Sequence, residues 1–345
     1  MSAPLPIKVL IVDDSAFARK VLREALSRDR RLSVVGIARD GLEALERTKE
    51  LSPDVVTLDL VMPNLDGLGF LHALPETGAP RVVVVTTSDA SSDLALAALS
   101  AGAVDFVHKP TALATDRLYE LSEELREKIV VAAAAHPRRH APMAAPAPAR
   151  TAARKGDGIV VIGTSTGGPQ ALARLVPALP ADLPVPVLIA LHIPAGYTEA
   201  LARRLDEASP LTVVEARDAD IELRAGLVVL ARGGDHLAVA RRDGVAVAFV
   251  DRFVRADAAY SPSVDHLFQS AAREFGPATL GVVLTGMGND GLEGSRAIRA
   301  GGGAVLVESA SSAVIYGMPR VVCEAGLATE EVPLEAMAAR ISSRL

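Results

Sequence analysis

Tryptophan is absent from this sequence of 345 residues, and only 3% of its residues are aromatic although 50% are hydrophobic. The cores must therefore be built from valine, leucine, isoleucine and alanine. Cysteine is almost absent as well, because Cys323 is the only one. A single cysteine excludes an internal disulfide and suits a reducing compartment, where its expected role is that of a small buried hydrophobe.

The sequence also lacks an excess of positive charge, since 36 lysines and arginines stand against 42 aspartates and glutamates, a net charge of -6. This balance argues against nucleic acid as a partner, because no basic excess is available to neutralise phosphates. Neither an export signal nor an apolar run as long as a membrane span is present. We therefore expect a cytoplasmic protein without membrane insertion, long enough for two domains.

The most informative stretch is Gly158–Pro169, with the sequence GIVVIGTSTGGP. It predicts a buried strand, a tight glycine turn with Ser165 at its apex, and a helix opened by Pro169. The pattern Gly163-x-Ser165-x-Gly167 is typical of a nucleophile elbow, which holds a serine hydroxyl above a helix N-terminus that can receive an oxyanion. A loop serine that caps a helix is the alternative. A dinucleotide-binding turn is disfavoured, because it needs glycine at position 165.

Residues 1–125 alternate short apolar runs with segments of helical periodicity. This alternation predicts a parallel sheet with helices on both faces, where function collects at the carboxyl ends of the strands. The segments are Ile7–Val12, Ala16–Leu26, Leu32–Ile37, Leu42–Leu51, Val55–Leu60, Arg81–Val85, Leu94–Ala101 and Val104–Val107.

Polar residues follow several of these strands. Asp13, Asp14 and Asp59 would repel one another at neighbouring strand ends unless a divalent cation lies among them, and oxygen-only ligands suit Mg²⁺. A carboxylate beside Mg²⁺ can accept a phosphoryl group, with a hydroxyl such as Thr86 and an ammonium such as Lys109 to bind its oxygens. Each residue also has an ordinary structural explanation, such as a helix cap, β-propensity or a surface charge.

Together these residues resemble the receiver domain of two-component response regulators. The acidic pair Asp13 and Asp14, the stretch LDLVMPNLDG around Asp59, Thr86 and Lys109 stand where that family has its functional residues. The resemblance implies that a histidine kinase phosphorylates Asp59, that Asp13 and Asp14 hold Mg²⁺ with it, and that Thr86 reorients as the switch.

Residues 126–157 are predicted to form a linker. A helix is expected over Leu118–Ala135, and the composition then changes to proline and alanine without apolar periodicity. Such a segment is a solvated, semi-extended tether, which allows one domain to regulate the other. The βα alternation resumes over residues 158–345, where Asp243-Gly244 indicates an inserted hairpin.

Two residues in the second half could complete a catalytic triad with Ser165. His192 directly follows the buried run Val185–Leu191, so we expect it at the same sheet edge as Ser165. Asp290 lies in a glycine-rich turn after another strand and could hold the imidazole in its tautomer. The alternatives are a packed core histidine and an N-cap for the helix predicted over Gly291–Ala300.

This second domain resembles the chemotaxis protein-glutamate methylesterase (CheB) family. The resemblance implies that Ser165 attacks a glutamyl methyl ester on a chemoreceptor, that His192 shuttles the proton and that Asp290 orients it. Backbone amides at Thr166 and Met287 would hold the oxyanion, and no cofactor is needed for the esterase. Some relatives also deamidate receptor glutamines, and in the family phosphorylation of the receiver relieves inhibition. The matching stretches are Ile162–Pro169, His192–Thr198, Ser261–Asp265 and Leu284–Gly291.

Three residues depart from these families without removing a catalytic atom. Val61 stands where an acidic residue often precedes Met-Pro, Leu191 where glutamine is expected, and Thr164 where alanine is common. Val61 is expected to change contacts with Mg²⁺ or with a partner, and Leu191 to weaken a hydrogen bond behind the site.

The expected fold is therefore α/β throughout. A doubly wound receiver domain with a five-stranded parallel sheet is linked to an α/β Rossmann-like esterase domain with an inserted β-hairpin. Two alternatives from other classes remain: a regulatory binding module that docks on a receptor or kinase without hydrolysis, and a response regulator that drives transcription. The intact set Ser165, His192 and Asp290 disfavours the first, and the absence of a basic recognition helix disfavours the second.

Overall fold

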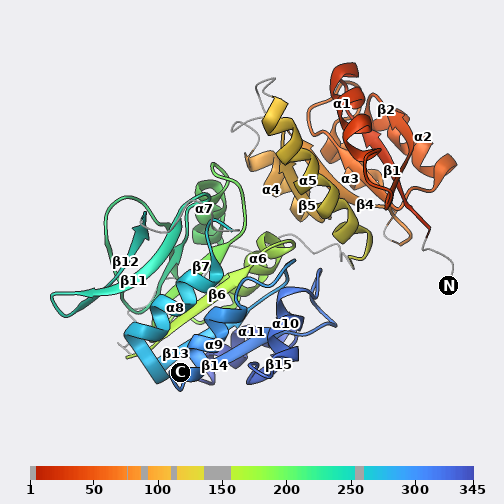
Figure 1. Cartoon of the computed structure of the whole chain (residues 1–345). Helices are drawn as coiled ribbons and strands as arrows, with labels where there is room; N and C mark the ends of the chain where they lie inside the picture. The colour runs from red at the N-terminus through yellow and green to blue at the C-terminus, as the bar shows by residue number, and fades with distance from the viewer. Residues whose placement is uncertain (1–4, 76, 87–91, 110–114, 136–156, 253–259) are drawn as a thin grey trace. The chain divides into compact units, whose positions relative to one another are not determined.

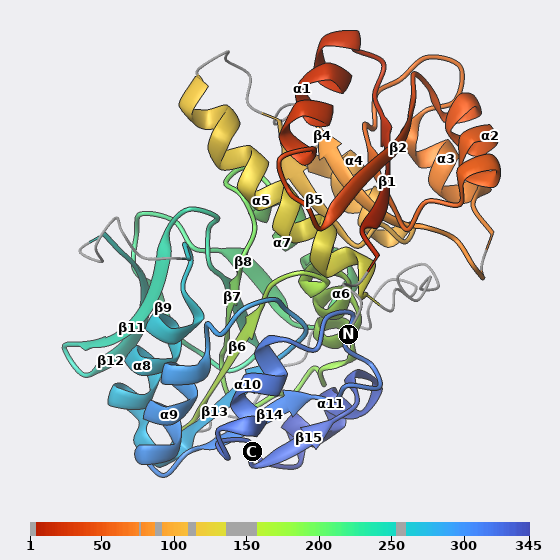
Figure 2. The same ribbon diagram turned by 45° about the vertical axis from the view of Figure 1, so that its right-hand side comes forward.

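The computed structural model describes residues 5–75, 77–86, 92–109, 115–135, 157–252 and 260–345. These form two compact units, which divide the chain into residues 1–142 and 143–345. Each unit is an α/β domain with its own core (Figures 1 and 2). None of the described helices is long and apolar enough to cross a lipid bilayer.

The first unit is built on a five-stranded parallel sheet, as predicted, and its strand order is β2-β1-β3-β4-β5. Helices α1 and α5 pack together on one face, and α2, α3 and α4 lie on the other (Figure 1). Covered on both faces, the central strands are almost entirely apolar. The elements are β1 (Ile7–Val12), α1 (Ala16–Leu26), β2 (Leu32–Ala38), α2 (Gly41–Leu51), β3 (Val55–Leu58), α3 (Gly67–Ala73), β4 (Arg81–Thr86), α4 (Ser92–Ser100), β5 (Asp105–His108) and α5 (Thr115–Ala133).

Two features of this unit differ from the sequence prediction. Helix α3 was not predicted, because it has only seven residues and two of them are glycines; Asp66 starts it by accepting a hydrogen bond from Gly69 N at 2.7 Å. Helix α5 continues past residue 125, the predicted domain limit, and buries Leu125 and Ile129 in the first unit. Residues 136–156, most of the predicted linker, lie outside the described residues.

The second unit contains a seven-stranded parallel sheet with the order β15-β14-β13-β6-β7-β10-β8. Helices α8, α9 and α10 cover one face, and α6, α7 and α11 form the other layer (Figure 2). The elements are β6 (Ile159–Thr164), α6 (Gly168–Ala178), β7 (Val187–Leu191), α7 (Thr198–Ala208), β8 (Thr212–Glu215), β9 (Ile221–Glu222), β10 (Leu227–Leu230), β11 (His236–Arg242), β12 (Val245–Asp251), α8 (Val264–Phe275), β13 (Thr279–Val283), α9 (Leu292–Ala300), β14 (Ala304–Glu308), α10 (Met318–Glu324), β15 (Glu330–Val332) and α11 (Leu334–Ser342).

The predicted hairpin is confirmed as β11 and β12, which pair in antiparallel register from His236 opposite Asp251 to Arg242 opposite Val245. Its turn residues Asp243 and Gly244 have φ angles of 50° and 83°, the left-handed region that Asp-Gly turns favour. With β9 these strands make a separate three-stranded sheet. The short strands β8, β9 and β15 were not predicted.

Strand β6 lies near the middle of the large sheet, between β13 and β7. All three strands run parallel, so their carboxyl ends open at one edge. The turns that follow them carry Thr285, Ser165 and His192. This edge is therefore the place where side chains distant in sequence meet.

Candidate active site and acidic cluster

The serine turn forms as the sequence predicts. Strand β6 ends at Thr164, and Gly167, with φ at 80°, begins α6, which has Pro169 in its first turn. The preceding Gly163 is needed because a Cβ there would lie 2.1 Å from Cγ1 of Val264 in α8. The glycines thus allow both the sharp turn and the close approach of a helix.

Thr285, at the end of β13, holds the turn from the side. Its carbonyl oxygen accepts hydrogen bonds from Ser165 N at 3.0 Å and from Thr164 Oγ1 at 2.8 Å. Its own hydroxyl donates to the carbonyl oxygen of Thr166 at 2.9 Å. The backbone around Ser165 is therefore fixed on the β13 side.

His192 lies beside this turn on the β7 side. Thr164 and Leu191 are register partners, and His192 N donates to the carbonyl oxygen of Thr164 at 3.1 Å. The ring nitrogen Nε2 is 2.8 Å from Asp290 Oδ2. The other nitrogen, Nδ1, is buried and has no hydrogen-bond partner among the described residues. A satisfied core histidine would use both nitrogens, so the unpartnered Nδ1 agrees with the predicted role of His192 as a base, which itself stays a prediction.

Asp290 is buried, and several groups donate hydrogen bonds to its carboxylate. Besides His192, its oxygens accept from Val264 N at 2.7 Å, Asp265 N at 2.8 Å and Ser263 Oγ at 3.2 Å. Burial alone would raise the pKa of Asp290, but the hydrogen bonds from His192 and from these backbone groups hold it below its usual value. It is therefore an anion at neutral pH, suited to stabilise an imidazolium.

Asp290 is not the main cap of the helix that follows it. Helix α9 begins at Leu292, and the first N–H groups of that turn, from Gly291 and Gly294, donate to Asp265 Oδ1 at 2.9 and 2.6 Å. Asp290 shares only the N–H of Gly291, at 3.1 Å. Its carboxylate is thus directed to the start of α8 and to His192.

Tyr260 was missed by the sequence reasoning. Its ring stacks on the imidazole of His192, with centroids 4.5 Å apart and planes 4° from parallel. Gly288 makes room for it, because a Cβ there would lie 2.5 Å from the tyrosine hydroxyl. Only its position next to the stretch Ser261–Asp265 signals this role in the sequence. The stack covers one face of His192 and limits the ring to one orientation.

The two residues predicted to hold an oxyanion lie near Ser165. Thr166 follows it directly, and Met287 follows Gly286, whose backbone packs on the serine: a Cβ on Gly286 would lie 2.8 Å from Ser165 Cβ. Their place agrees with the predicted role, which itself stays a prediction.

Behind Thr285 lies Glu308, a second carboxylate that the sequence reasoning missed. Only 1% of the residue is exposed, and its oxygens accept from Thr285 N at 2.8 Å and Ser312 Oγ at 2.9 Å. Burial raises the pKa of Glu308, and these hydrogen bonds offset the rise only in part. A buried group that is easier to protonate couples the stability of this part of the domain to pH.

Replacing Glu308 with glutamine is expected to stabilise the protein as pH rises. Because the pKa of Glu308 is raised on folding, its contribution to stability is intact below the unfolded pKa and is lost as pH rises through the folded value. Glutamine cannot ionise, and its oxygen can still accept from Thr285 N. Urea unfolding should give the two proteins similar free energies of unfolding at about pH 4 and a more stable variant at about pH 8. Glu293→Gln, at an exposed ion pair, is the control; a wild-type advantage that grows with pH would contradict the prediction.

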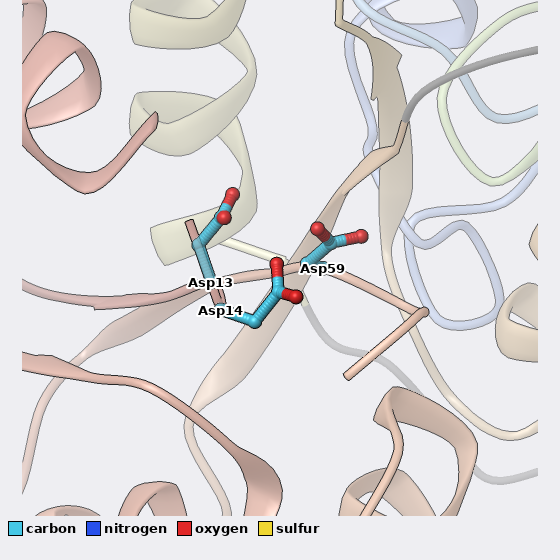
Figure 3. Close-up of side chains that lie close together, drawn as sticks. All are labelled: Asp13, Asp14 and Asp59. Atoms are coloured by element: carbon cyan, nitrogen blue, oxygen red, sulfur yellow. The ribbon is translucent and has the colours of Figure 1, made fainter. Parts of the chain in front are cut away.

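Three acidic residues of the first unit come together at the carboxyl edge of its sheet. Asp13, Asp14 and Asp59 each offer an oxygen, and these oxygens lie within 4.8 Å of one another (Figure 3). Lys109 Nζ lies 2.5 Å from Asp13 Oδ2 and 2.6 Å from Asp59 Oδ2. Burial raises the pKa of Asp13, which Lys109 offsets only in part. An oxygen-only set of this size suits Mg²⁺.

Thr86 and Val61 border this cluster. Thr86 is buried at the end of β4, and its carbonyl oxygen accepts from Lys109 N at 2.7 Å, so the hydroxyl and the ammonium come from paired strands. Val61 N donates a long bond of 3.4 Å to Asp59 Oδ1, while its side chain is 65% exposed. The residue that departs from the family is therefore at the open side of Asp59.

A five-stranded sheet with an acidic cluster, followed by a seven-stranded sheet with a serine turn beside a His–Asp pair, is the arrangement of a response regulator receiver domain joined to an α/β esterase domain. The family model of the response regulator receiver domain matches residues 9–121, and that of the CheB methylesterase matches residues 160–341. The chain therefore belongs to the CheB methylesterase family. Its receiver domain implies a Mg²⁺ site formed by Asp13, Asp14 and Asp59.

Relatives match over nearly the whole chain. A protein-glutamate methylesterase/protein-glutamine glutaminase of Myxococcus xanthus is 59% identical and covers 98% of each chain. One from Thermotoga maritima is 39% identical and covers 95% of each. The crystal structure of the Thermotoga maritima CheB methylesterase catalytic domain is 37% identical and has a TM-score of 0.52; it covers 55% of this chain and 98% of that domain.

Proposed function

We propose that this protein hydrolyses glutamyl methyl esters on chemoreceptors for sensory adaptation, under the control of its phosphorylated receiver domain. The observation that carries the proposal is the 2.8 Å contact of His192 with Asp290 beside the Ser165 turn. It occurs in a chain 59% identical to a methylesterase/glutaminase across 98% of its length. That relative's name covers both activities, so we extend the proposal to receptor glutamines.

The reaction follows from the roles of three side chains. Ser165 Oγ attacks the ester carbonyl while His192 Nδ1 takes its proton, and Asp290 stabilises the imidazolium through Nε2. Backbone N–H groups of Thr166 and Met287 receive the oxyanion. His192 returns the proton to the leaving oxygen, and methanol departs. Water, deprotonated by the same imidazole, then releases a glutamate carboxylate and restores the serine. With a glutamine, ammonia leaves in place of methanol. No cofactor takes part.

The receiver domain would take its phosphoryl group from a histidine kinase. A carboxylate oxygen of Asp59 attacks phosphorus, the P–N bond to the kinase histidine breaks and its imidazole leaves, and Lys109 contacts a phosphoryl oxygen from the side of β5. Asp13 and Asp14, with Asp59, would hold Mg²⁺, which supplies positive charge for those oxygens. Thr86, at the end of the neighbouring strand, would turn its hydroxyl toward the new phosphoryl group and so begin the switch.

The test is methanol release from membranes that contain a methylated chemoreceptor. We expect release by the full chain to rise when acetyl phosphate and Mg²⁺ are added, by about 5- to 150-fold, the usual range of coupling between two sites. Asp59→Asn should keep the basal rate and lose the rise, because it removes the phosphoryl acceptor.

Asp54→Asn is the matched control, since Asp54 precedes the same strand at its opposite end and binds Lys8 N. It should respond as the wild type does. If the wild type releases no methanol under any condition, the esterase proposal fails and the binding-module interpretation replaces it. A full response in Asp59→Asn would refute control through Asp59.

A further inference from the structure

The stretch Ser261–Asp265 ends in the carboxylate of Asp265, which has no role in the proposed mechanism. Asp265 lies in the first turn of α8, and its side chain is partly buried next to Asp290. Burial raises the pKa of Asp265 to about 6, and the charge of Asp290 adds to the rise. A second carboxylate so close to the first is unfavourable unless the surrounding donors require it.

Each carboxylate accepts backbone hydrogen bonds from the segment that carries the other. Asp290 Oδ1 accepts from Asp265 N at 2.8 Å. In the opposite direction, Asp265 Oδ1 accepts from the N–H of Gly291, the residue after Asp290, at 2.9 Å, and from Gly294 N at 2.6 Å. The first turns of α8 and α9 are thus tied by two exchanged carboxylates. Neither turn can shift without lengthening a bond at both aspartates.

The contact between the helices leaves little space for adjustment. A Cβ on Gly294 would lie 3.0 Å from Asp265 Cα and 2.5 Å from Phe268 Cβ, so the backbone of α9 rests directly on α8. Because the two backbones are in contact, only a side chain with the length of aspartate places its acceptor oxygen correctly for Gly291 N and Gly294 N. A side chain longer by one methylene would push Gly291, and Asp290 with it, away from α8.

We propose that Asp265 is a positioning residue of the esterase site, which fixes the backbone of Gly291 and Gly294 and thereby the Asp290 oxygen that meets His192 Nε2. Asp265 acts through Asp290 and does not contact the substrate. The inference rests on the proposed function for its kinetic consequence, whereas the geometry of the His192–Asp290 pair is independent of the substrate.

The variants Asp265→Asn and Asp265→Glu separate the position of the acceptor from its charge. Asparagine keeps an oxygen at the same distance without the charge, and glutamate keeps the charge one methylene farther out. Both are close to the wild type in size and should fold. Asp206→Glu is the matched control, because Asp206 Oδ1 also accepts from a backbone N–H of the same domain, that of Val213 at 2.8 Å, away from the site.

Two readouts are needed, the kinetics of methanol release and the low-field proton resonance of the imidazole Nε2–H shared with Asp290. For Asp265→Glu we expect kcat to fall about 100-fold with KM little changed, as for a small misplacement of a catalytic group, and the resonance to weaken or move. Asp265→Asn and Asp206→Glu should keep both kcat and the resonance near the wild type.

These outcomes test the positioning role of Asp265 separately from the proposed esterase activity. Wild-type kcat and an unchanged resonance in Asp265→Glu would overturn the inference. So would a loss in Asp265→Asn as large as that in Asp265→Glu, because an acceptor oxygen at the unchanged position would then not be sufficient. If the wild type releases no methanol, the proposed function fails, and the resonance alone still shows whether Asp265 positions Asp290.

Discussion

Replacing Ser165 with alanine is expected to lower kcat for methanol release by about 10⁴- to 10⁶-fold, the range measured when one member of a triad is removed. Ser165 is the residue proposed to form the acyl-enzyme, so without its hydroxyl only the residual contribution of the oxyanion donors and of binding should remain. The substitution removes one oxygen at a turn whose backbone is held by Thr285, so the free energy of unfolding should change little. KM should stay close to that of the wild type.

The measurement is methanol release by the purified full chain at saturating methylated receptor, with thermal unfolding in parallel. Ser343→Ala is the matched control, because Ser343 is an exposed serine whose hydroxyl bonds only locally, to the carbonyl oxygen of Arg340. It should keep the wild-type rate. A loss of less than tenfold in Ser165→Ala would show that another group is the nucleophile.

Replacing Asp290 with asparagine is the second large effect, with kcat expected to fall by about 10⁴-fold, as when the acid of a triad is made neutral. The new amide cannot accept from all the donors that now surround the carboxylate. If the NH₂ group replaces Oδ2, it faces both Val264 N and His192 Nε2 and forces the imidazole into the wrong tautomer. If it replaces Oδ1, it faces Asp265 N. In both cases a buried donor loses its acceptor, so stability should fall by about 1–3 kcal/mol as well.

This prediction is checked by kcat for methanol release and by urea unfolding of the same preparations. Asp206→Asn is the control, since it disturbs a carboxylate-to-backbone bond of comparable length at Val213 N. We expect the control to lose some stability and no activity. Wild-type kcat in Asp290→Asn would exclude Asp290 as the partner of the catalytic histidine.

The architecture could be predicted because it depends on local patterns. Apolar runs of strand length between helical segments define parallel sheets, and such sheets bring their carboxyl ends to one edge. From this rule alone, Asp13 and Asp59 were expected together, as were Ser165 and His192. The structure places each pair at a common edge. The first-unit sheet and the hairpin at Asp243 follow the same reasoning.

The contacts that surround and hold the site residues could not be predicted from the sequence. Tyr260 meets His192, Glu308 meets Thr285 and Asp265 meets Gly291 across 68, 23 and 26 positions of sequence. The hydrophobic periodicity of the sequence does not predict such pairs, because they depend on how helices and loops pack above the sheet. The short strands β8, β9 and β15 were missed for a similar reason. They hold four, two and three residues, and a neighbouring strand rather than their own sequence makes them β structure.

The close approach of α8 to β6 at Gly163 makes the esterase core and its chemistry one cooperative unit. Val264, which fills the space left by the missing side chain, belongs to the same turn that donates to Asp290. Docking α8 on the strand that carries the serine therefore completes the core and brings the acid into place in a single event. A partly folded domain with the helix undocked would keep the serine turn but lose the N–H groups that fix Asp290, so we expect such a species to have no esterase activity.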